Sequence, residues 1–173
     1  MDSDQELNVA ITWAEKLAQE IAPDEIDQVP FVVAGFMKNE KARKKLLQQS
    51  KGNTLGGFGV ESHALLPWLF QAMSLATPFL GGLLASRTFT SLLVIIKEIK
   101  ALLAARNQRP PEQTQLTLTD PLAQQSADAL AQTLRVAGLS SEKSEIIAYE
   151  LLSFLLQDPT NAVIFLQKIT ERK

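Results

Sequence analysis

The stretch Ala64–Ala85 reads ALLPWLFQAMSLATPFLGGLLA and contains no charged residue. A run of about 20 apolar residues reaches the length of a membrane-spanning helix. Pro67, Pro78 and Gly81-Gly82 interrupt this run, which allows two short helices in place of one. In a soluble protein the stretch forms the buried centre of a helical bundle, whereas in a membrane protein it enters lipid. Both interpretations stay open at this point.

The residues from Phe89 to Arg106 predict an amphipathic helix. Its polar face carries Lys97, Glu98 and Lys100. Its apolar side chains recur at helical spacing and are Leu92, Ile95, Ile96, Ile99, Leu102 and Leu103. Together with the apolar stretch, this helix predicts a central apolar helical hairpin.

The N-terminal part of the chain predicts three short helices. Ser3 and Glu6 stand at the capping-box spacing that begins a helix, and a proline ends that helix after Ile21. The acids Asp24-Glu25 suit the start of the next helix. Asn39 separates the second helix from a third, basic one, whose expected C-terminal stop is a glycine.

The C-terminal part resembles the N-terminal part in the order of its helices and helix breakers. The octet that begins at Ala14, AEKLAQEI, shares an alanine, an acid and Leu-Ala-Gln in register with ADALAQTL, which begins at Ala127. An apolar helix follows each octet, broken by Asn39 in one part and by Asp158-Pro159 in the other. We interpret the likeness as an internal duplication, although short amphipathic helices also resemble one another through composition alone.

The expected fold is all-α, a multi-helix bundle of about seven helices. Two similar three-helix segments, 1–52 and 120–173, flank the central helices of 64–106. A Gly-rich loop, 53–63, and a Pro/Gln-rich linker, 107–119, join these parts, because clustered glycines and adjacent prolines oppose regular helices.

Charge is segregated along a chain whose formal net charge is only -2. Residues 1–37 hold eight acids against Lys16 alone, whereas residues 38–109 hold eleven Lys or Arg against three acids. Residues 110–173 are again acidic. Such asymmetry indicates either internal pairing between segments or an anionic partner for the middle one.

The densest basic cluster consists of Lys38, Lys41, Arg43, Lys44, Lys45 and Lys51. We interpret it first as a solvated helix face, or as a face that docks on the acidic segment 1–37. An anionic membrane is the second interpretation. Nucleic acid is the least favoured partner, since no aromatic residue is interleaved for base stacking.

No set of residues in the sequence predicts catalysis. Cysteine is absent, which removes thiolate nucleophiles and cysteine-ligated metals. The single histidine, His63, follows Glu61 and Ser62, but no nucleophile elbow surrounds this serine. The glycines at 56–59 lack the spacing and the lysine of a phosphate-binding loop. We therefore expect no catalytic residue, metal, cofactor or small-molecule substrate.

The leading hypothesis is a non-enzymatic interaction or adaptor protein that assembles with itself or with another protein. Its candidate surface consists of Trp68, Phe70, Phe79, Leu80, Leu92, Ile95, Ile96 and Ile99. The alternative is a membrane-associated or membrane-active effector that uses the apolar, basic segment 64–106. An enzyme with an unrecognised set of residues is the third hypothesis.

The amino terminus indicates where the protein acts. Met1-Asp2-Ser3-Asp4-Gln5-Glu6 is acidic, whereas a secretory signal begins with basic and then apolar residues. The absence of cysteine also suits a reducing compartment. We expect a cytoplasmic protein, with peripheral attachment to the inner membrane surface under the membrane hypothesis.

Overall fold

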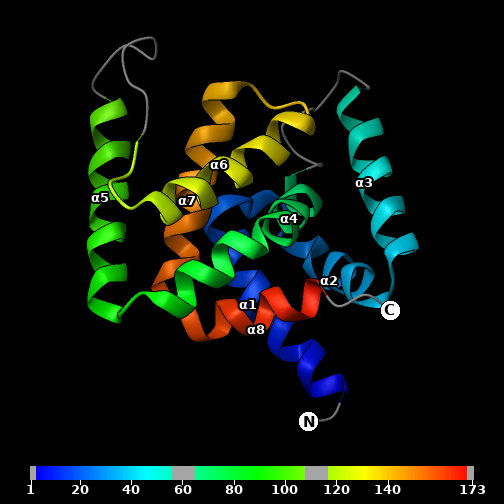
Figure 1. Ribbon diagram of the computed structural model, residues 1–173. Coiled ribbons are helices and arrows are strands. Elements are labelled where there is room, and N and C mark those ends of the chain that lie inside the picture. Colours follow the sequence, from blue (N-terminus) through cyan, green and yellow to red (C-terminus); the bar gives the residue numbers. More distant parts are fainter. Residues whose placement is uncertain (1–2, 56–64, 108–116, 171–173) are drawn as a thin grey trace. The chain divides into compact units, whose positions relative to one another are not determined.

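The computed structural model describes residues 3–55, 65–107 and 117–170, and every regular element within these ranges is a helix (Figure 1). The prediction of an all-α fold is confirmed. The described residues form eight α-helices and one 3-10 helix, slightly more than expected. They are α1 (Ser3–Ile21), η1 (Pro23–Gln28), α2 (Val29–Lys38), α3 (Glu40–Leu55), α4 (Leu65–Ser86), α5 (Phe89–Asn107), α6 (Pro121–Val136), α7 (Ser141–Gln157) and α8 (Pro159–Thr170).

Contacts divide the chain into two compact units. Unit 1 comprises Met1–Ser74 and Ile164–Lys173, and unit 2 comprises Leu75–Val163. Both boundaries fall inside helices, one in α4 and one in α8. These boundaries differ from those predicted from the sequence, which lie at the Gly-rich loop and at the Pro/Gln-rich linker. Most of that loop and of that linker lies outside the described residues.

The apolar stripe of α1 forms part of the core of unit 1. Its residues recur three and four positions apart, which places them on one helical face. The first half of α4 and one face of α2 supply most of the remaining core. The buried side chains are Ala10, Trp13, Ala14, Leu17 and Ala18 in α1, Val29, Val32, Val33 and Phe36 in α2, and Leu66, Leu69, Phe70, Ala72 and Met73 in α4.

Four aromatic rings meet in the core of unit 1. Phe70 meets Phe36 edge to face with 5.4 Å between the ring centroids, and it meets Phe165 in the same way at 5.2 Å. The ring centroids of Trp13 and Phe165 are 4.5 Å apart. These separations suit the attraction between aromatic rings that adds to their burial. The cluster therefore joins α1, α2, α4 and α8, which are far apart in the sequence.

A buried carboxylate caps the beginning of α4. Glu25 in η1 is only 2% exposed, and its carboxylate accepts hydrogen bonds from the amides of Leu65 (3.3 Å) and Leu66 (3.0 Å). The first amides of a helix have no partner within that helix, and the helix dipole also favours a negative charge there. Pro67 follows and has no amide hydrogen to satisfy. Glu25 thus stabilises a helix that begins 40 residues further along the chain.

α4 is a single helix from Leu65 to Ser86, so the two short helices that its prolines allowed are not formed. Pro67 lies in the first turn, where a missing amide hydrogen costs little. Pro78 lies inside the helix and cannot donate a hydrogen bond to the carbonyl of Ser74. Buried apolar side chains on both sides of Pro78 offset this loss, because packing outweighs local helix propensity.

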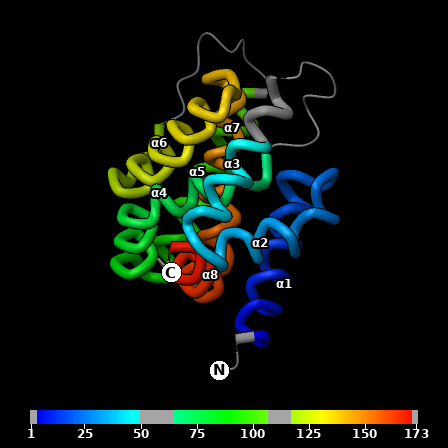
Figure 2. The backbone as a smooth tube through the Cα atoms, turned by 90° about the vertical axis from the view of Figure 1, so that its right-hand side faces the viewer, coloured from blue at the N-terminus to red at the C-terminus, as the bar shows by residue number. Residues whose placement is uncertain are grey.

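α7 lies at the centre of unit 2 and packs against both α5 and α6 (Figure 2). Its residues Leu151–Leu156 are all buried, as expected for a helix that is covered on several sides. Next to it, the hydroxyl of the buried Tyr149 donates a hydrogen bond to the side-chain oxygen of Gln124 (3.1 Å). Burial is the main cause that raises the pKa of Tyr149 to about 12. This tyrosine therefore stays neutral at physiological pH.

A buried arginine joins α5 to α7. Arg106 is 7% exposed, and its Nη1 donates to Glu145 at 3.2 Å. Its Nη2 lies 3.8 Å from Glu142, and Arg135 approaches Glu145 at the same distance. A buried charge is tolerated when nearby groups of opposite charge satisfy it. Two acids of α7 fulfil this requirement.

Asp120 begins α6 and connects it to the turn after α4. Its carboxylate accepts hydrogen bonds from the amides of Leu122 (2.9 Å) and Ala123 (3.2 Å), as a helix N-cap does. The same carboxylate accepts hydrogen bonds from Nε (2.6 Å) and Nη2 (3.1 Å) of Arg87. The hydrogen bond from Arg87 is the largest of the effects that lower the pKa of Asp120 below its ordinary value.

We expect the stabilisation from this pair to be lost in acid. Because the pKa of Asp120 is lower in the folded chain, the stabilisation is present at neutral pH and disappears as the pH falls below about 4. In the Arg87→Gln variant the pKa of Asp120 should rise towards its ordinary value, which an NMR titration of this carboxyl carbon measures. The Lys97→Gln variant removes the same charge elsewhere in unit 2 and should leave that pKa unchanged. An unaltered pKa in Arg87→Gln contradicts the assignment.

Candidate interaction surfaces

The structure places most residues of the predicted interaction surface in the protein interior. Seven of the eight are between 0% and 8% exposed: Trp68, Phe70, Leu80, Leu92, Ile95, Ile96 and Ile99. Phe79 is 38% exposed. The prediction assigned the strongest apolar stripes to a surface, but helices in a folded unit turn these stripes inward because that removes most apolar area from water. These seven residues therefore build the cores of the two units.

Unit 2 exposes a different set of apolar side chains on the outer faces of α4 and α5. We call this set the α4–α5 apolar surface; it comprises Leu75, Phe79, Phe89, Leu93 and Val94, with exposed fractions from 38% to 63%. Leu75 and Phe79 lie one turn apart on α4, and Phe89 and Leu93 lie one turn apart on α5. Only two residues separate the end of α4 from the start of α5 (Figure 1).

The exposed charges next to the α4–α5 apolar surface are positive. On α4, the exposed positions from Leu75 onward carry no charge. On α5, Lys97 and Lys100 are exposed. The acid of this helix, Glu98, accepts hydrogen bonds from the amide (2.6 Å) and hydroxyl (3.1 Å) of Thr119. The surface therefore combines large apolar side chains with two lysines.

Helical spacing contains a signal for this second surface. At about 100° per residue, Leu93 lies roughly 20° from Lys100 and roughly 40° from Lys97, but roughly 120° from Ile99 at the centre of the buried stripe. Sorting the apolar residues of this helix into two faces identifies a weaker apolar face beside the lysines. The interaction surface predicted from the sequence used the stronger face alone.

The basic cluster divides into buried and exposed members. Arg43 is half-buried: its Nε donates to the carbonyl of Phe36 at 2.6 Å, and its guanidinium lies 5.7 Å from the ring centroid of Phe36. Burial is the main cause that lowers the pKa of Arg43, and the charge of Glu40 partly opposes it. Arg43 therefore attaches α3 to α2. Lys38 is exposed at the end of α2, and the side chain of Lys51 lies outside the described residues.

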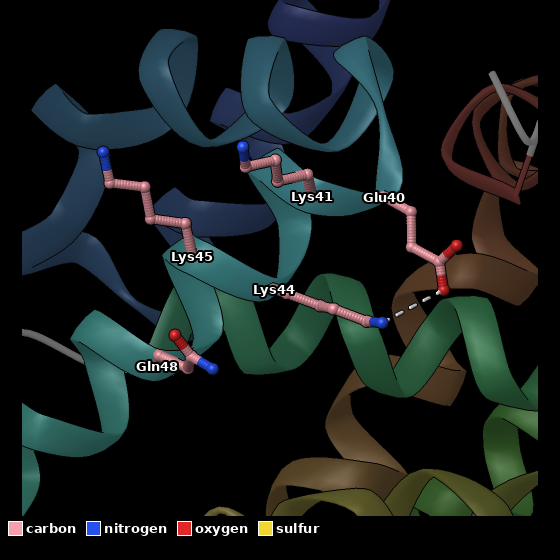
Figure 3. Close-up of a pocket in the computed structure, with 5 residues that line it drawn as sticks. All are labelled: Glu40, Lys41, Lys44, Lys45 and Gln48. Carbon is pink, nitrogen blue, oxygen red and sulfur yellow. Dashed lines mark ion pairs between the residues drawn. The ribbon is translucent and has the colours of Figure 1, made fainter.

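The exposed members that lie on α3 form the α3 basic face, defined as Lys41, Lys44 and Lys45. A solvent-open pocket of about 530 Å³ lies along this face, and Glu40 and Gln48 complete its lining (Figure 3). Lys41 and Lys45 extend in the same direction from successive turns, whereas Lys44 turns towards Glu40. The ion pair between Lys44 and Glu40 measures 3.7 Å, and both side chains are 70% exposed.

The expected docking of these lysines on the acidic segment 1–37 does not account for their charges. Within the described part of the chain, Lys44 pairs with Glu40, and Lys41 and Lys45 have no ion pair. In the acidic segment, Glu6 pairs with Lys168 at 2.9 Å, and Glu25 caps α4. As far as the described residues go, Lys41 and Lys45 are therefore available to a partner from outside the chain.

Two further features bear on function. Over residues 3–55, 65–107 and 117–170, no three or more His, Cys, Asp or Glu side chains are grouped so that they could hold a metal ion. His63, Glu61 and Ser62 lie outside these ranges.

One described helix, α4, is long and apolar enough to cross a membrane. However, 39% of its apolar window is buried inside the protein, and core helices of soluble proteins have the same length and composition.

Comparison with known proteins gives no assignment. The chain matches no known protein family, no curated protein and no solved structure. Any inference about function therefore rests on the α4–α5 apolar surface and the α3 basic face.

Proposed function

We propose that this chain is a non-enzymatic helical interaction protein that self-associates through the α4–α5 apolar surface. The observation that supports the proposal is the exposure of five large apolar side chains on two connected helices of unit 2. Fully burying one such side chain contributes about 1.5 to 3 kcal/mol, before the cost of association is subtracted. A second copy of the chain would supply the apolar face that these side chains lack.

The size of this surface determines what a dimer interface must include. At about 1.5 Å per residue, the exposed apolar side chains span roughly 6 Å of α4 and roughly 8 Å of α5. A stable interface of roughly 800 Å² per partner would therefore also bury the polar positions around them. In a two-fold arrangement each apolar face contacts its own counterpart, and Lys97 and Lys100 lie towards the edge, where lysines remain hydrated.

Analytical ultracentrifugation over a wide range of protein concentration tests this proposal. We expect wild-type chain to form dimers and the Phe89→Ser/Leu93→Ser double variant to remain monomeric. The matched control is Phe31→Ser, which removes an aromatic ring that is 67% exposed on α2 in unit 1 and should leave the dimer intact. A wild-type chain that stays monomeric at the highest concentration contradicts self-association through this surface.

An anionic membrane is the second candidate partner of the same surface, as the alternative hypothesis holds. The observation that favours it is the pair Lys97 and Lys100 beside the apolar side chains, because lysines attract anionic headgroups. Vesicle flotation distinguishes the two candidates. Binding to anionic but not to neutral vesicles, weakened in Lys97→Gln/Lys100→Gln, supports the membrane. Binding to neither kind of vesicle contradicts it.

We also propose that the segments 1–52 and 120–173 arose by duplication. Burial at matched positions supports this proposal: in the paired octets, Ala14, Leu17 and Ala18 are buried, and so are Ala127, Leu130 and Ala131. Helices that descend from one ancestor are expected to keep the same face towards a core.

A further inference from the structure

We propose that the α3 basic face is a binding site for a compact anion that carries several phosphate groups. This site lies in unit 1, on a helix that does not belong to the α4–α5 apolar surface. The inference therefore does not rest on the proposed self-association.

The positive charges of the lysines on α3 are only weakly neutralised. Lys41 and Lys45 lie one helical turn apart, and like charges at this spacing destabilise a helix. Lys44 adds a third charge on the same side of the helix. The exposed ion pair with Glu40 offsets little of this repulsion, because solvent screens it. A bound polyanion would remove the repulsion from all three lysines at once.

Residues other than the exposed lysines attach α3 to the rest of unit 1, so these lysines are not needed to hold the helix in place. The amide of Ala42 donates to the side chain of Asn39 at 2.8 Å, which caps the helix. Leu46 is buried over Gly35, where a Cβ would clash with it. Together with Arg43, these residues hold α3 by its other side. Substituting the exposed lysines should therefore leave the fold intact.

The composition of the pocket indicates the class of ligand. Three ammonium groups and the side-chain amide of Gln48 are donors that suit phosphate oxygens. A volume of about 530 Å³ accommodates a small molecule. Among the described residues, the lining contains no aromatic side chain on which a base could stack, which disfavours nucleic acid. A compact polyphosphate fits, whether it is a free molecule or a lipid headgroup.

Isothermal titration calorimetry with inorganic tripolyphosphate tests the site. We expect wild-type chain to bind with an affinity that falls as salt is added, because these charges are exposed to solvent. The Lys41→Gln/Lys45→Gln variant should bind about tenfold more weakly, since two of the three attractive charges are lost. The matched control is Lys97→Gln/Lys100→Gln, which removes the same charge from α5 and should bind as the wild type does.

The Glu40→Gln variant tests the sign of the interaction. It removes the negative charge that lines the pocket and releases Lys44 from its ion pair. We expect tripolyphosphate to bind about two- to fivefold more tightly to this variant, since a repulsive charge has been removed. A purely structural role for α3 does not account for tighter binding.

Vesicles that carry a polyphosphorylated lipid headgroup distinguish the two sources of phosphate. Binding of tripolyphosphate without binding of vesicles identifies a free ligand, and lysine-dependent binding of vesicles identifies a headgroup. Three results overturn the proposal: no binding of either probe, equal weakening in both lysine pairs, or tighter lysine-dependent binding of single-stranded nucleic acid than of tripolyphosphate. None of these results bears on self-association, which depends on α4 and α5.

Discussion

Replacing Phe70 by alanine is expected to lower the free energy of unfolding by about 3 to 5 kcal/mol, the cost of emptying a large aromatic site in a core. Phe70 is fully buried, and its ring meets those of Phe36 and Phe165 edge to face. Removing it leaves a cavity between helices that come from both ends of the chain. The surrounding helices cannot close this cavity without moving several buried residues.

Denaturant titration followed by tryptophan fluorescence measures this loss. Both tryptophans of the chain, Trp13 and Trp68, are buried in unit 1, so their fluorescence reports on the unit that contains Phe70. The control is Phe31→Ala, which removes an exposed ring and should change stability by at most about 0.5 kcal/mol. A loss in Phe70→Ala no larger than that of the control contradicts the assigned core.

Replacing Glu25 by alanine is expected to lower the free energy of unfolding by about 2 to 4 kcal/mol, because the amides of Leu65 and Leu66 lose a charged acceptor. These amides lie at a helix start where Glu25 and Leu66 are both buried, so water cannot easily replace the carboxylate. The Glu25→Gln variant keeps one acceptor oxygen, so its free energy of unfolding should fall by less than that of Glu25→Ala. The same fluorescence titration measures both variants.

The control for this prediction is the neighbouring acid in η1. Asp24 is exposed, and Asp24→Ala should change stability by at most about 0.5 kcal/mol. Amide hydrogen exchange adds a local measurement, since Glu25→Ala should speed exchange at the first turn of α4 more than in α6. If Asp24→Ala and Glu25→Ala lower the free energy of unfolding by the same amount, then the carboxylate of Glu25 does not cap α4.

Local chemistry determined where several helices begin and end, although α3 continues past the glycine that was expected to stop it and ends at Leu55. α1 ends just before Pro23, because proline cannot continue the backbone hydrogen bonding of a helix. Asn39 separates α2 from α3, and its side chain caps the second of these helices. The stripe predicted from Phe89 to Arg106 became α5, which ends one residue later. Proline geometry, caps and helical spacing act over a few residues, so the sequence contains them directly.

α4 shows where tertiary packing overrides local preference. Pro78 and the two glycines at 81–82 favour a break, yet the helix continues through them. Apolar burial along most of α4 outweighs the one hydrogen bond that Pro78 cannot make. The strength of that burial depends on neighbours that are distant in the sequence, so local propensity alone could not predict a continuous helix.

The candidate surfaces also depend partly on the sequence alone and partly on tertiary packing. The sequence by itself determined that the chain is helical, that α5 is amphipathic and that lysines gather on α3. Only the tertiary structure decided that Ile99 faces the core while Phe89 faces solvent, and that Arg43 binds the backbone of α2 while Lys41 stays exposed. Helical spacing sorts residues into faces, but the face that is covered depends on contacts between distant segments, such as the one between Glu25 and the start of α4.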